Sequence, residues 1–290
     1  MRCQRWHLQR GLILTAKVGV GLRPTHYPYI QSNWPTEVDH FEVISENYMY
    51  SRGRPLETLL RIRERYPILA HGVSMSIMSA DGVPEDYLEK LRDFYSLIEP
   101  KVCSDHLCWT GNAHNNIHDL LPFPFTKSFL ELAITNISKV QDYLGRSMAF
   151  ENLSAYISFG ESNYSEWDFL VQACKTTGAK ILLDLNNIWV NATNFKFDPQ
   201  EYIDAIPLDI IAQIHLGGPT DTGKFLFDTH STEVPEKVWH LLMTNSQRFS
   251  HIPVIVERDD EIPDFPMLLD ELRHARQILV PSQRKTNASF

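Results

Sequence analysis

The feature that most constrains this fold is an alternation of short apolar runs with longer amphipathic segments. Eight runs rich in Val, Ile and Leu occur at residues 17–23, 40–45, 68–73, 101–107, 147–153, 180–187, 210–218 and 253–259. Each run is continuously apolar rather than alternately apolar and polar, which is typical of strands buried on both faces of a parallel sheet. The sequence therefore predicts eight buried parallel strands.

The segments between these runs have the spacing of amphipathic helices. Seven helices are predicted, at residues 55–66, 84–100, 126–145, 165–178, 198–207, 234–249 and 265–279. Ser165 is a typical N-cap, and Gly145 and Gly178 are typical helix ends. Only the first crossover, residues 24–39, lacks a helical pattern.

Eight strands that alternate with helices predict an α/β protein, a (β/α)8 TIM barrel in a single domain. A doubly wound open sheet is the alternative, but no glycine-rich phosphate loop follows a strand, and "GVG" at 19–21 is too weak a match. We expect the barrel to span residues 17–280, after an N-terminal extension at 1–16 and before a flexible polar tail at 281–290.

Polar side chains stand where the predicted strands end, which is the edge of a barrel that carries active sites. They are Glu46, His71, His106, Glu151, Asp184, Asn187, His215, Glu257 and Asp259, with Asp228 and His230 in the loop after the seventh strand. Each alone could be a satisfied core residue or a turn cap. Together they would bury many carboxylates, which is prohibitive without compensating positive charge. Because Lys and Arg are missing from the set, apart from Arg258, metal cations are the expected source of that charge.

The size and chemistry of this set limit the metal. Four histidines and about four carboxylates exceed what one six-coordinate ion needs, so two or three ions are expected. The set has no thiolate, and the four cysteines of the chain form no CxxC pair. Mixed imidazole and carboxylate ligands fit iron, zinc or manganese.

The charge and hydropathy of the chain argue against some partners. A formal net charge of −9 and a pI near 5.7 disfavour a protein that coats nucleic acid or an anionic membrane. No stretch approaches the ~20 apolar residues of a membrane helix, and the N-terminus is a poor match to an export signal. We therefore expect a cytoplasmic enzyme with neither nucleic acid nor membrane as partner.

The order of these residues, with the surrounding words, resembles a known family. "GVGLR", "EVISENYM", "AHGVSMS", "SDHLCW", "FENLSAYI", "LLDLNNIWV", "IHLGG", "DTH" and "VIVERD" together are similar to the multinuclear non-haem iron-dependent oxidative enzymes (MNIO), which include the methanobactin oxazolone-forming enzyme. The resemblance covers roughly residues 17–280. It implies an xylose-isomerase-like TIM barrel that holds two or three iron ions, in mixed Fe(II)/Fe(III) states, and uses O2 as co-substrate.

The resemblance also implies roles for particular residues and partners. The metal ligands would be His71, His106, Glu151, Asp184, Asn187, His215, Asp228, His230 and Glu257. Glu46, Asn47 and Asn152 would lie beside the substrate or the ligands. The substrate would be a ribosomally synthesised precursor peptide, modified at cysteine, and a small leader-binding protein would form a heterodimer with the enzyme.

Two points remain open in the sequence. A zinc-dependent phosphodiesterase of the endonuclease IV type is the alternative function, although Asn187 stands where that pattern has histidine, and a non-enzymatic metal-binding scaffold is a third, disfavoured one. Asp259, two residues beyond Glu257, is equally a candidate proton acceptor and a carboxylate that orients a ligand.

Overall fold

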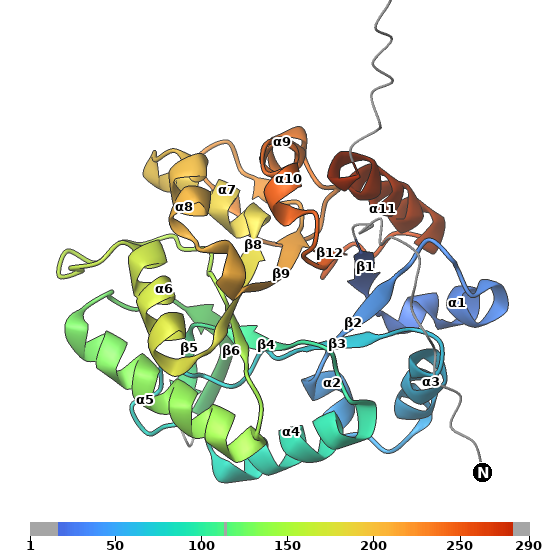
Figure 1. The fold of residues 1–290 in the computed structure, drawn as a ribbon, viewed down its shortest axis with the longest axis horizontal. Helices are drawn as coiled ribbons and strands as arrows, with labels where there is room; N and C mark the ends of the chain where they lie inside the picture. The colour runs from blue at the N-terminus through green and yellow to red at the C-terminus, as the bar shows by residue number, and fades with distance from the viewer. Residues whose placement is uncertain (1–16, 113–114, 281–290) are drawn as a thin grey trace, which may run out of the picture.

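The barrel is built from eight parallel strands, and the computed structural model describes residues 17–112 and 115–280 (Figure 1). The strands are β1 (Val18–Gly21), β2 (His40–Ile44), β3 (Ile68–His71), β4 (Cys103–His106), β7 (Ala149–Glu151), β8 (Lys180–Asp184), β9 (Ile211–Leu216) and β12 (Val254–Val256). They close in the order β1-β12-β9-β8-β7-β4-β3-β2. The predicted TIM barrel is confirmed, whereas the predicted extension and tail lie outside the described residues.

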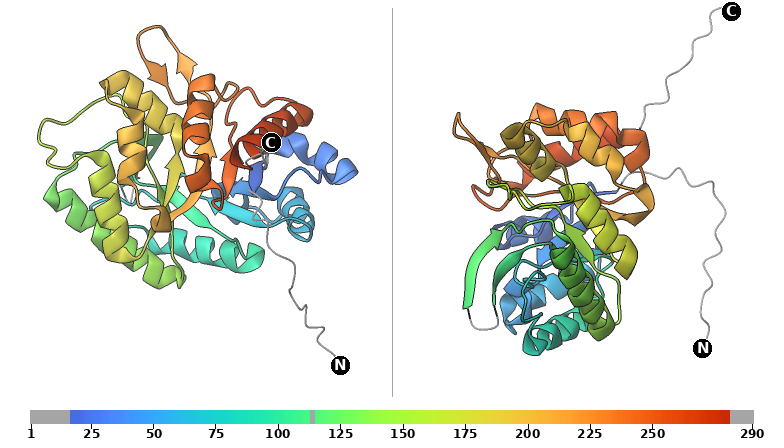
Figure 2. Two further views of the ribbon diagram at one scale, coloured as in Figure 1. Left: turned by 45° about the horizontal axis from the view of Figure 1, so that its top comes forward. Right: turned by 90° about the vertical axis from the view of Figure 1, so that its left-hand side faces the viewer.

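Helices surround the barrel and cover the outer faces of its strands (Figures 1 and 2). They are α3 (Arg54–Arg63), α4 (Glu85–Ile98), α5 (Lys127–Leu144), α6 (Glu166–Thr177), α8 (Pro199–Ala205), α9 (Glu236–Thr244) and α11 (Phe265–Leu279), with shorter α2 (Glu46–Met49), α10 (Ser246–Phe249) and η2 (Leu208–Ile210). The predicted boundary signals are present: the Ser165 hydroxyl accepts a hydrogen bond from Asp168 N, and Gly145 and Gly178 end their helices at φ of 66° and 73°.

Besides the short α2 and η2, two segments form helices that were not predicted. The first crossover contains η1 (Pro24–His26) and α1 (Tyr27–Asn33), so the expectation of no helix there is wrong. Pro24 and Pro28 occupy first-turn positions, where the missing N–H costs no hydrogen bond. The second is α7 (Leu185–Phe195), which begins directly after β8, whereas the sequence extended that strand to residue 187. Its asparagines have low helix propensity, so the sequence pattern did not predict this helix.

Two hairpins extend the loops that follow β4 and β9. The first pairs β5 (Trp109–Asn112) with β6 (Asn115–Leu121), and the second pairs β10 (Thr220–Asp221) with β11 (Leu226–Phe227). Both reach out on one side of the barrel, to the left in the right-hand view of Figure 2. Because they follow the carboxyl ends of strands, they flank the barrel mouth.

The apolar core and the barrel interior differ in character. Phe150, Ile181 and Ile214 are fully buried, as expected of strands covered on both faces. The interior also contains buried polar side chains, among them Glu42 and Gln213, which contact one another. The cysteines that the structure describes, Cys103, Cys108 and Cys174, are buried and free. Within the described ranges, helices are too short or too polar to cross a bilayer.

Candidate metal centre

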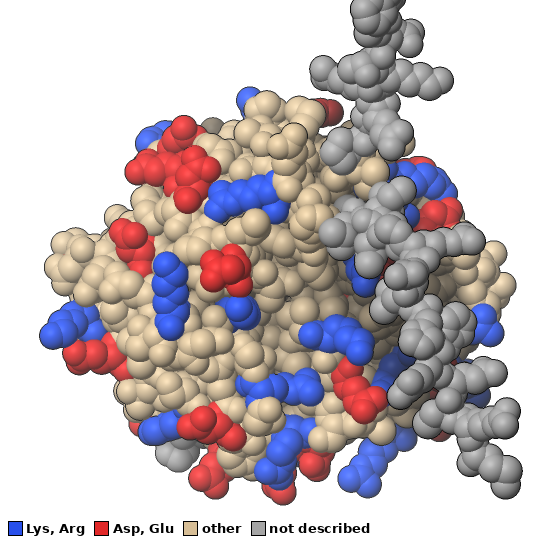
Figure 3. Space-filling model, in the orientation of Figure 1, with Lys and Arg blue, Asp and Glu red and all other residues tan. Residues whose placement is uncertain are grey.

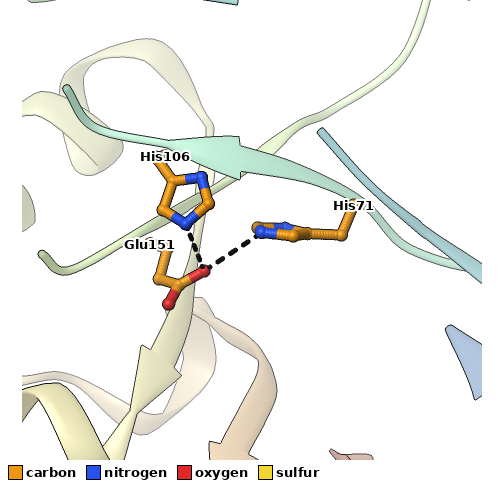
Figure 4. A group of neighbouring side chains, drawn as sticks. All are labelled: His71, His106 and Glu151. Carbon is orange, nitrogen blue, oxygen red and sulfur yellow. Dashed lines mark ion pairs between the residues drawn. The ribbon is translucent and has the colours of Figure 1, made fainter. Parts of the chain in front are cut away.

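The ends of three neighbouring strands bring two imidazoles to one carboxylate. His71 ends β3, His106 ends β4 and Glu151 ends β7 (Figure 4). Glu151 Oε2 lies 3.4 Å from Nε2 of His71 and 3.4 Å from Nε2 of His106. All three side chains are buried. Three donor atoms therefore converge at the floor of the barrel mouth.

The other ring nitrogen of each histidine is held by the protein. His71 Nδ1 lies 2.9 Å from Ser104 Oγ, and His106 Nδ1 lies 3.2 Å from the Gly72 carbonyl oxygen. Donation from Nδ1 to that carbonyl leaves the His106 Nε2 lone pair directed at Glu151. Burial lowers the pKa of His71 well below its usual value and that of His106 to about 4. Both rings are therefore neutral at neutral pH, the form that binds a cation.

A second group surrounds His215 on β9. His215 Nδ1 lies 2.8 Å from Glu257 Oε2, and its Nε2 lies 2.8 Å from Glu42 Oε1. Burial alone would lower the pKa of His215, but Glu42 and Glu257 raise it well above its usual value. Glu42 is absent from the sequence prediction because it lies inside β2 rather than at its end. The signal that could have found it is a carboxylate within an otherwise apolar run.

A third group surrounds His230, in the loop that follows β11. His230 Nε2 is 3.0 Å from Asp228 Oδ1 and 3.3 Å from Asp184 Oδ2, and its Nδ1 is 3.3 Å from Glu257 Oε2. The His230 ring packs directly on Gly217, where an added Cβ would lie 2.1 Å from the ring. His230 itself has φ of 44°, in the left-handed region that is costly for a residue with a side chain. The "IHLGG" and "DTH" segments are therefore shaped to place this imidazole.

These groups share members. Four sets of three ligand atoms, each set within 4.8 Å, can be formed from the described residues: His71, His106 and Glu151; Glu42, His215 and Glu257; Glu151, Asp184 and His215; Asp184, His230 and Glu257. Glu151, Asp184, His215 and Glu257 each belong to two sets. The arrangement is thus one connected cluster with room for more than one cation.

Asparagines hydrogen-bond to the backbone and side chains of this cluster. Asn152 Oδ1 accepts from Asp184 N and its Nδ2 donates to Asp184 O, at 2.8 and 3.1 Å. Asn187 Nδ2 donates to Glu151 Oε1 at 3.3 Å, and Asp184 Oδ1 accepts from Asn187 N at 2.8 Å. Asn186 Nδ2 donates to Asp228 Oδ1 at 2.8 Å. Asn152 and Asn187 thus contact the cluster, and the role of Asn187 as a metal ligand stays a prediction.

Unsatisfied atoms test whether metal ions suit this cluster. Glu151 Oε2, Asp184 Oδ2 and Asn187 Oδ1 are buried and make no hydrogen bond. Orphaned buried oxygens are costly, and a coordinated cation would satisfy them. Burial also raises the pKa of Glu151 well above its usual value, and burial, despite His230, raises the pKa of Asp228 to about 6. The donor set therefore fits resident divalent or trivalent cations.

A cavity of about 290 Å³ opens above the cluster. Arg23 and Asp259 lie on its wall, where they form an ion pair, and Asp259 Oδ2 is also 3.3 Å from His230 Nδ1. The sequence prediction missed the cation Arg23, because it included residue 23 in the first strand and took no site residue from the end of that strand. Arg258 faces away and forms an ion pair with Glu271 at 2.8 Å. Arg23 neutralises Asp259, which leaves the buried cluster without compensation from arginine.

Two predicted residues lie apart from the cluster. Glu46 Oε1 accepts hydrogen bonds from Val73 N and Ser74 N, both at 2.9 Å, and from Tyr87 Oη at 2.7 Å. Glu46 therefore shapes the loop that follows β3 rather than facing the histidines. Asn47 is exposed on α2.

Known proteins resemble this chain over most of its length. Residues 17–280 match the family model described as "RiPP precursor modification enzyme MbnB/TglH/ChrH". A "UPF0276 protein" of Caulobacter vibrioides is 47% identical over 259 residues, covering 89% of this chain and 92% of the relative. Another, of Rhizorhabdus wittichii, is 45% identical over 268 residues, covering 92% and 96%.

Solved structures with low sequence identity share the fold. A D-psicose 3-epimerase crystallised with D-fructose superposes with a TM-score of 0.60 at 16% identity, covering 91% of this chain and all of that one. Endonuclease IV from Thermus thermophilus gives 0.59 at 15% identity, covering 89% and 98%. These likenesses show the barrel and nothing about activity.

Proposed function

The chain belongs to the MbnB/TglH/ChrH family of RiPP precursor modification enzymes, and on that premise we propose that it is a multinuclear iron- and O2-dependent oxidase of a ribosomally made precursor peptide. The modified residue in this proposal is cysteine, and the enzyme acts in the cytoplasm. The ligands would be the nine residues that the resemblance implies, with Glu42 holding the second nitrogen of His215.

The connected ligand cluster carries the proposal. Because Glu151, Asp184, His215 and Glu257 each belong to two ligand sets, neighbouring cations would share ligands and lie close together. Closely spaced redox-active ions suit reactions that remove more than one electron from a substrate. A closed structural site has no need of a cavity above its ligands, whereas this cluster lies beneath one of about 290 Å³.

The ligand chemistry favours iron over zinc in this proposal. Iron, when bound, supplies the redox chemistry and activates O2, which amino-acid side chains alone cannot do. Asn187 offers a neutral amide oxygen where the zinc phosphodiesterase pattern has an imidazole, so this position is a weaker site for zinc. Figure 3 views the side of the barrel opposite the two hairpins, and basic and acidic side chains of the described residues are interspersed there. The formal net charge of −9 disfavours a nucleic-acid backbone as partner.

The rim of the mouth suits a peptide substrate. Three segments there expose large apolar side chains, between 38% and 58% accessible: Trp109, Ile117, Tyr156, Ile157, Phe225 and Phe227. Tyr156 packs on Phe227 with ring centroids 4.9 Å apart, and its hydroxyl accepts a hydrogen bond from Asp228 N. A contact made by Tyr156 at the rim can therefore affect Asp228, one of the proposed ligands. Exposed apolar groups around a polar cavity are a common feature of interaction sites.

Residues at the cavity wall would position substrate and protons. Asp259 is half-exposed beside His230, and we propose it as the proton acceptor. Its ion pair with Arg23 and its contact with His230 also support the second role, in which it orients that imidazole. The two roles differ in what happens to bound metal when the carboxylate is replaced.

The proposal includes a small leader-binding partner protein. The barrel and its loops account for the described residues, and a shallow mouth would bind a flexible peptide weakly because ordering the peptide offsets contact energy. A partner that holds the leader would raise the effective concentration of the peptide at the cluster.

The test is an anaerobic preparation loaded with iron, mixed with a cysteine-containing precursor peptide encoded beside this gene and then exposed to O2. We expect uptake of O2 and a mass change at one peptide residue. Cleavage of DNA at abasic sites by zinc-loaded protein, without O2 uptake by the iron-loaded form, would instead support the phosphodiesterase.

A further inference from the structure

A second, smaller cavity lies beside the metal centre and has mainly apolar walls. Its volume is about 20 Å³, above the roughly 10–15 Å³ that one water-sized molecule needs. The apolar walls that matter here are Leu107, Phe123, Phe125, Leu153, Ala155 and Leu170, and we call this space the side cavity. It has the size for one small molecule.

Two of the three polar residues that line the side cavity, Asn152 and Glu166, hydrogen-bond to groups elsewhere in the protein. Asn152 exchanges two hydrogen bonds with the backbone of Asp184, and Glu166 accepts one from Asn191 Nδ2 at 3.2 Å. The carboxylate of Glu151 faces histidines and an amide of the metal centre. Glu151 Oε2 makes no hydrogen bond but lies 3.4 Å from the two imidazoles of the metal centre. The other walls are mainly apolar and offer few of the two to four polar partners that a buried water needs. An apolar molecule is therefore the better occupant.

The side cavity reaches the metal centre without passing through the mouth. Glu151 and Leu153 line both the side cavity and the 290 Å³ cavity, so these two residues separate them. Phe125 and Ala155 are only partly buried, which places the other end of the side cavity near the surface. A peptide that fills the mouth would thus leave this second approach to Glu151 open.

We propose that the side cavity binds molecular oxygen and delivers it to the centre beside Glu151. This inference rests on the proposed function, since only an O2-using enzyme needs such a site. Oxygen is apolar, close in size to water, and gains from leaving water for an apolar space. Separate approaches allow peptide and gas to be bound at the same time.

The test combines gas binding with kinetics. Crystals of the iron-loaded protein are pressurised with krypton, an electron-dense apolar gas. The proteins compared are wild type, Ala155→Leu, which fills the side cavity, and Leu170→Ala, which enlarges it. Ala205→Leu, on the exposed surface of α8, is the matched control. We expect krypton in wild type and Leu170→Ala but not in Ala155→Leu.

In Ala155→Leu the KM for O2 should rise about fivefold or more, because the larger side chain overfills a packed space. The KM for peptide should stay unchanged. Absence of krypton from both wild type and Leu170→Ala overturns the inference, even where Ala155→Leu does not fold. An unchanged KM for O2 in a folded Ala155→Leu that excludes krypton also overturns it. If wild type consumes no O2 with peptide, the proposed function itself has failed.

Discussion

Replacing Glu151 with glutamine tests the shared ligand directly. Glu151 belongs to two of the four ligand sets, so Glu151→Gln should lower bound iron by more than one ion's share. The neutral amide keeps the shape of the side chain but removes the charge that, under the proposed function, would hold two cations together. Glu151→Ala should lose at least as much. Metal content per chain, measured after anaerobic reconstitution, gives the result.

Thermal unfolding supplies the magnitude. An ion at one hundred times its Kd stabilises the folded state by about 2.7 kcal/mol. At roughly 2–4 °C per kcal/mol for a chain near this size, each bound ion should raise Tm by roughly 5–10 °C. Wild type should therefore show a metal-dependent rise in Tm that Glu151→Gln largely loses.

The metal-free protein should respond in the opposite direction. Burial raises the pKa of Glu151, so its ionised form is disfavoured in the folded state and stability is lost as pH rises above the unfolded value of 4.5. Metal-free Glu151→Gln should then be at least as stable as metal-free wild type at pH 7. Glu46→Gln is the control, because Glu46 bonds backbone amides rather than the cluster and should keep full iron. Full iron and activity in Glu151→Gln would refute the placement of this residue.

The remaining predictions concern two carboxylates, one histidine and the partner. If Asp259 accepts a proton, Asp259→Asn should keep its iron but lose turnover. Loss of both iron and turnover would instead show that Asp259 orients His230. Unchanged turnover would contradict both roles. Glu42→Gln should weaken metal affinity about 10–100-fold in a chelator competition, since Glu42 lies 2.8 Å from His215 Nε2, and an unchanged affinity would refute that role. Burial lowers the pKa of His40 from 6.5 to about 4, so the unfolded state binds the proton first and stability falls as pH drops through that window. At 1.36 kcal/mol per pKa unit, the free energy of unfolding should fall by about 3 kcal/mol because of His40. In urea unfolding, His40→Gln should therefore make stability depend less on pH than in wild type. An equal dependence on pH in the two proteins would contradict this. Enzyme with its leader-binding partner should turn over peptide faster than enzyme alone at low peptide concentration, and equal rates would contradict the tethering argument.

The fold was predictable because a strand that is covered on both faces needs apolar residues at nearly every position, and such runs are easy to recognise in the sequence. Its boundaries were less so: Asp184 ends β8 as the cap of a helix, and the asparagines after it concealed α7. The polar strand ends predicted where the candidate metal centre lies, because the carboxyl ends of barrel strands meet at one mouth.

The rest of the site depends on tertiary contacts that spacing does not reveal. Glu42 lies within a strand, and only the closed barrel brings it to His215. Arg23 reaches Asp259 across the β1–β12 contact, which joins the two ends of the barrel sequence. The hairpins after β4 and β9 arise from loop segments with weak strand patterns. The assignment of individual ligands stays a prediction until metal is measured.

Elemental analysis of protein purified without oxygen, together with Mössbauer spectroscopy of the bound iron, tests whether the cluster holds coupled iron ions. We expect two or three iron ions per chain, with magnetic coupling between neighbouring ions that share ligands. A preparation that contains zinc in place of iron, or a single isolated iron ion, would contradict it.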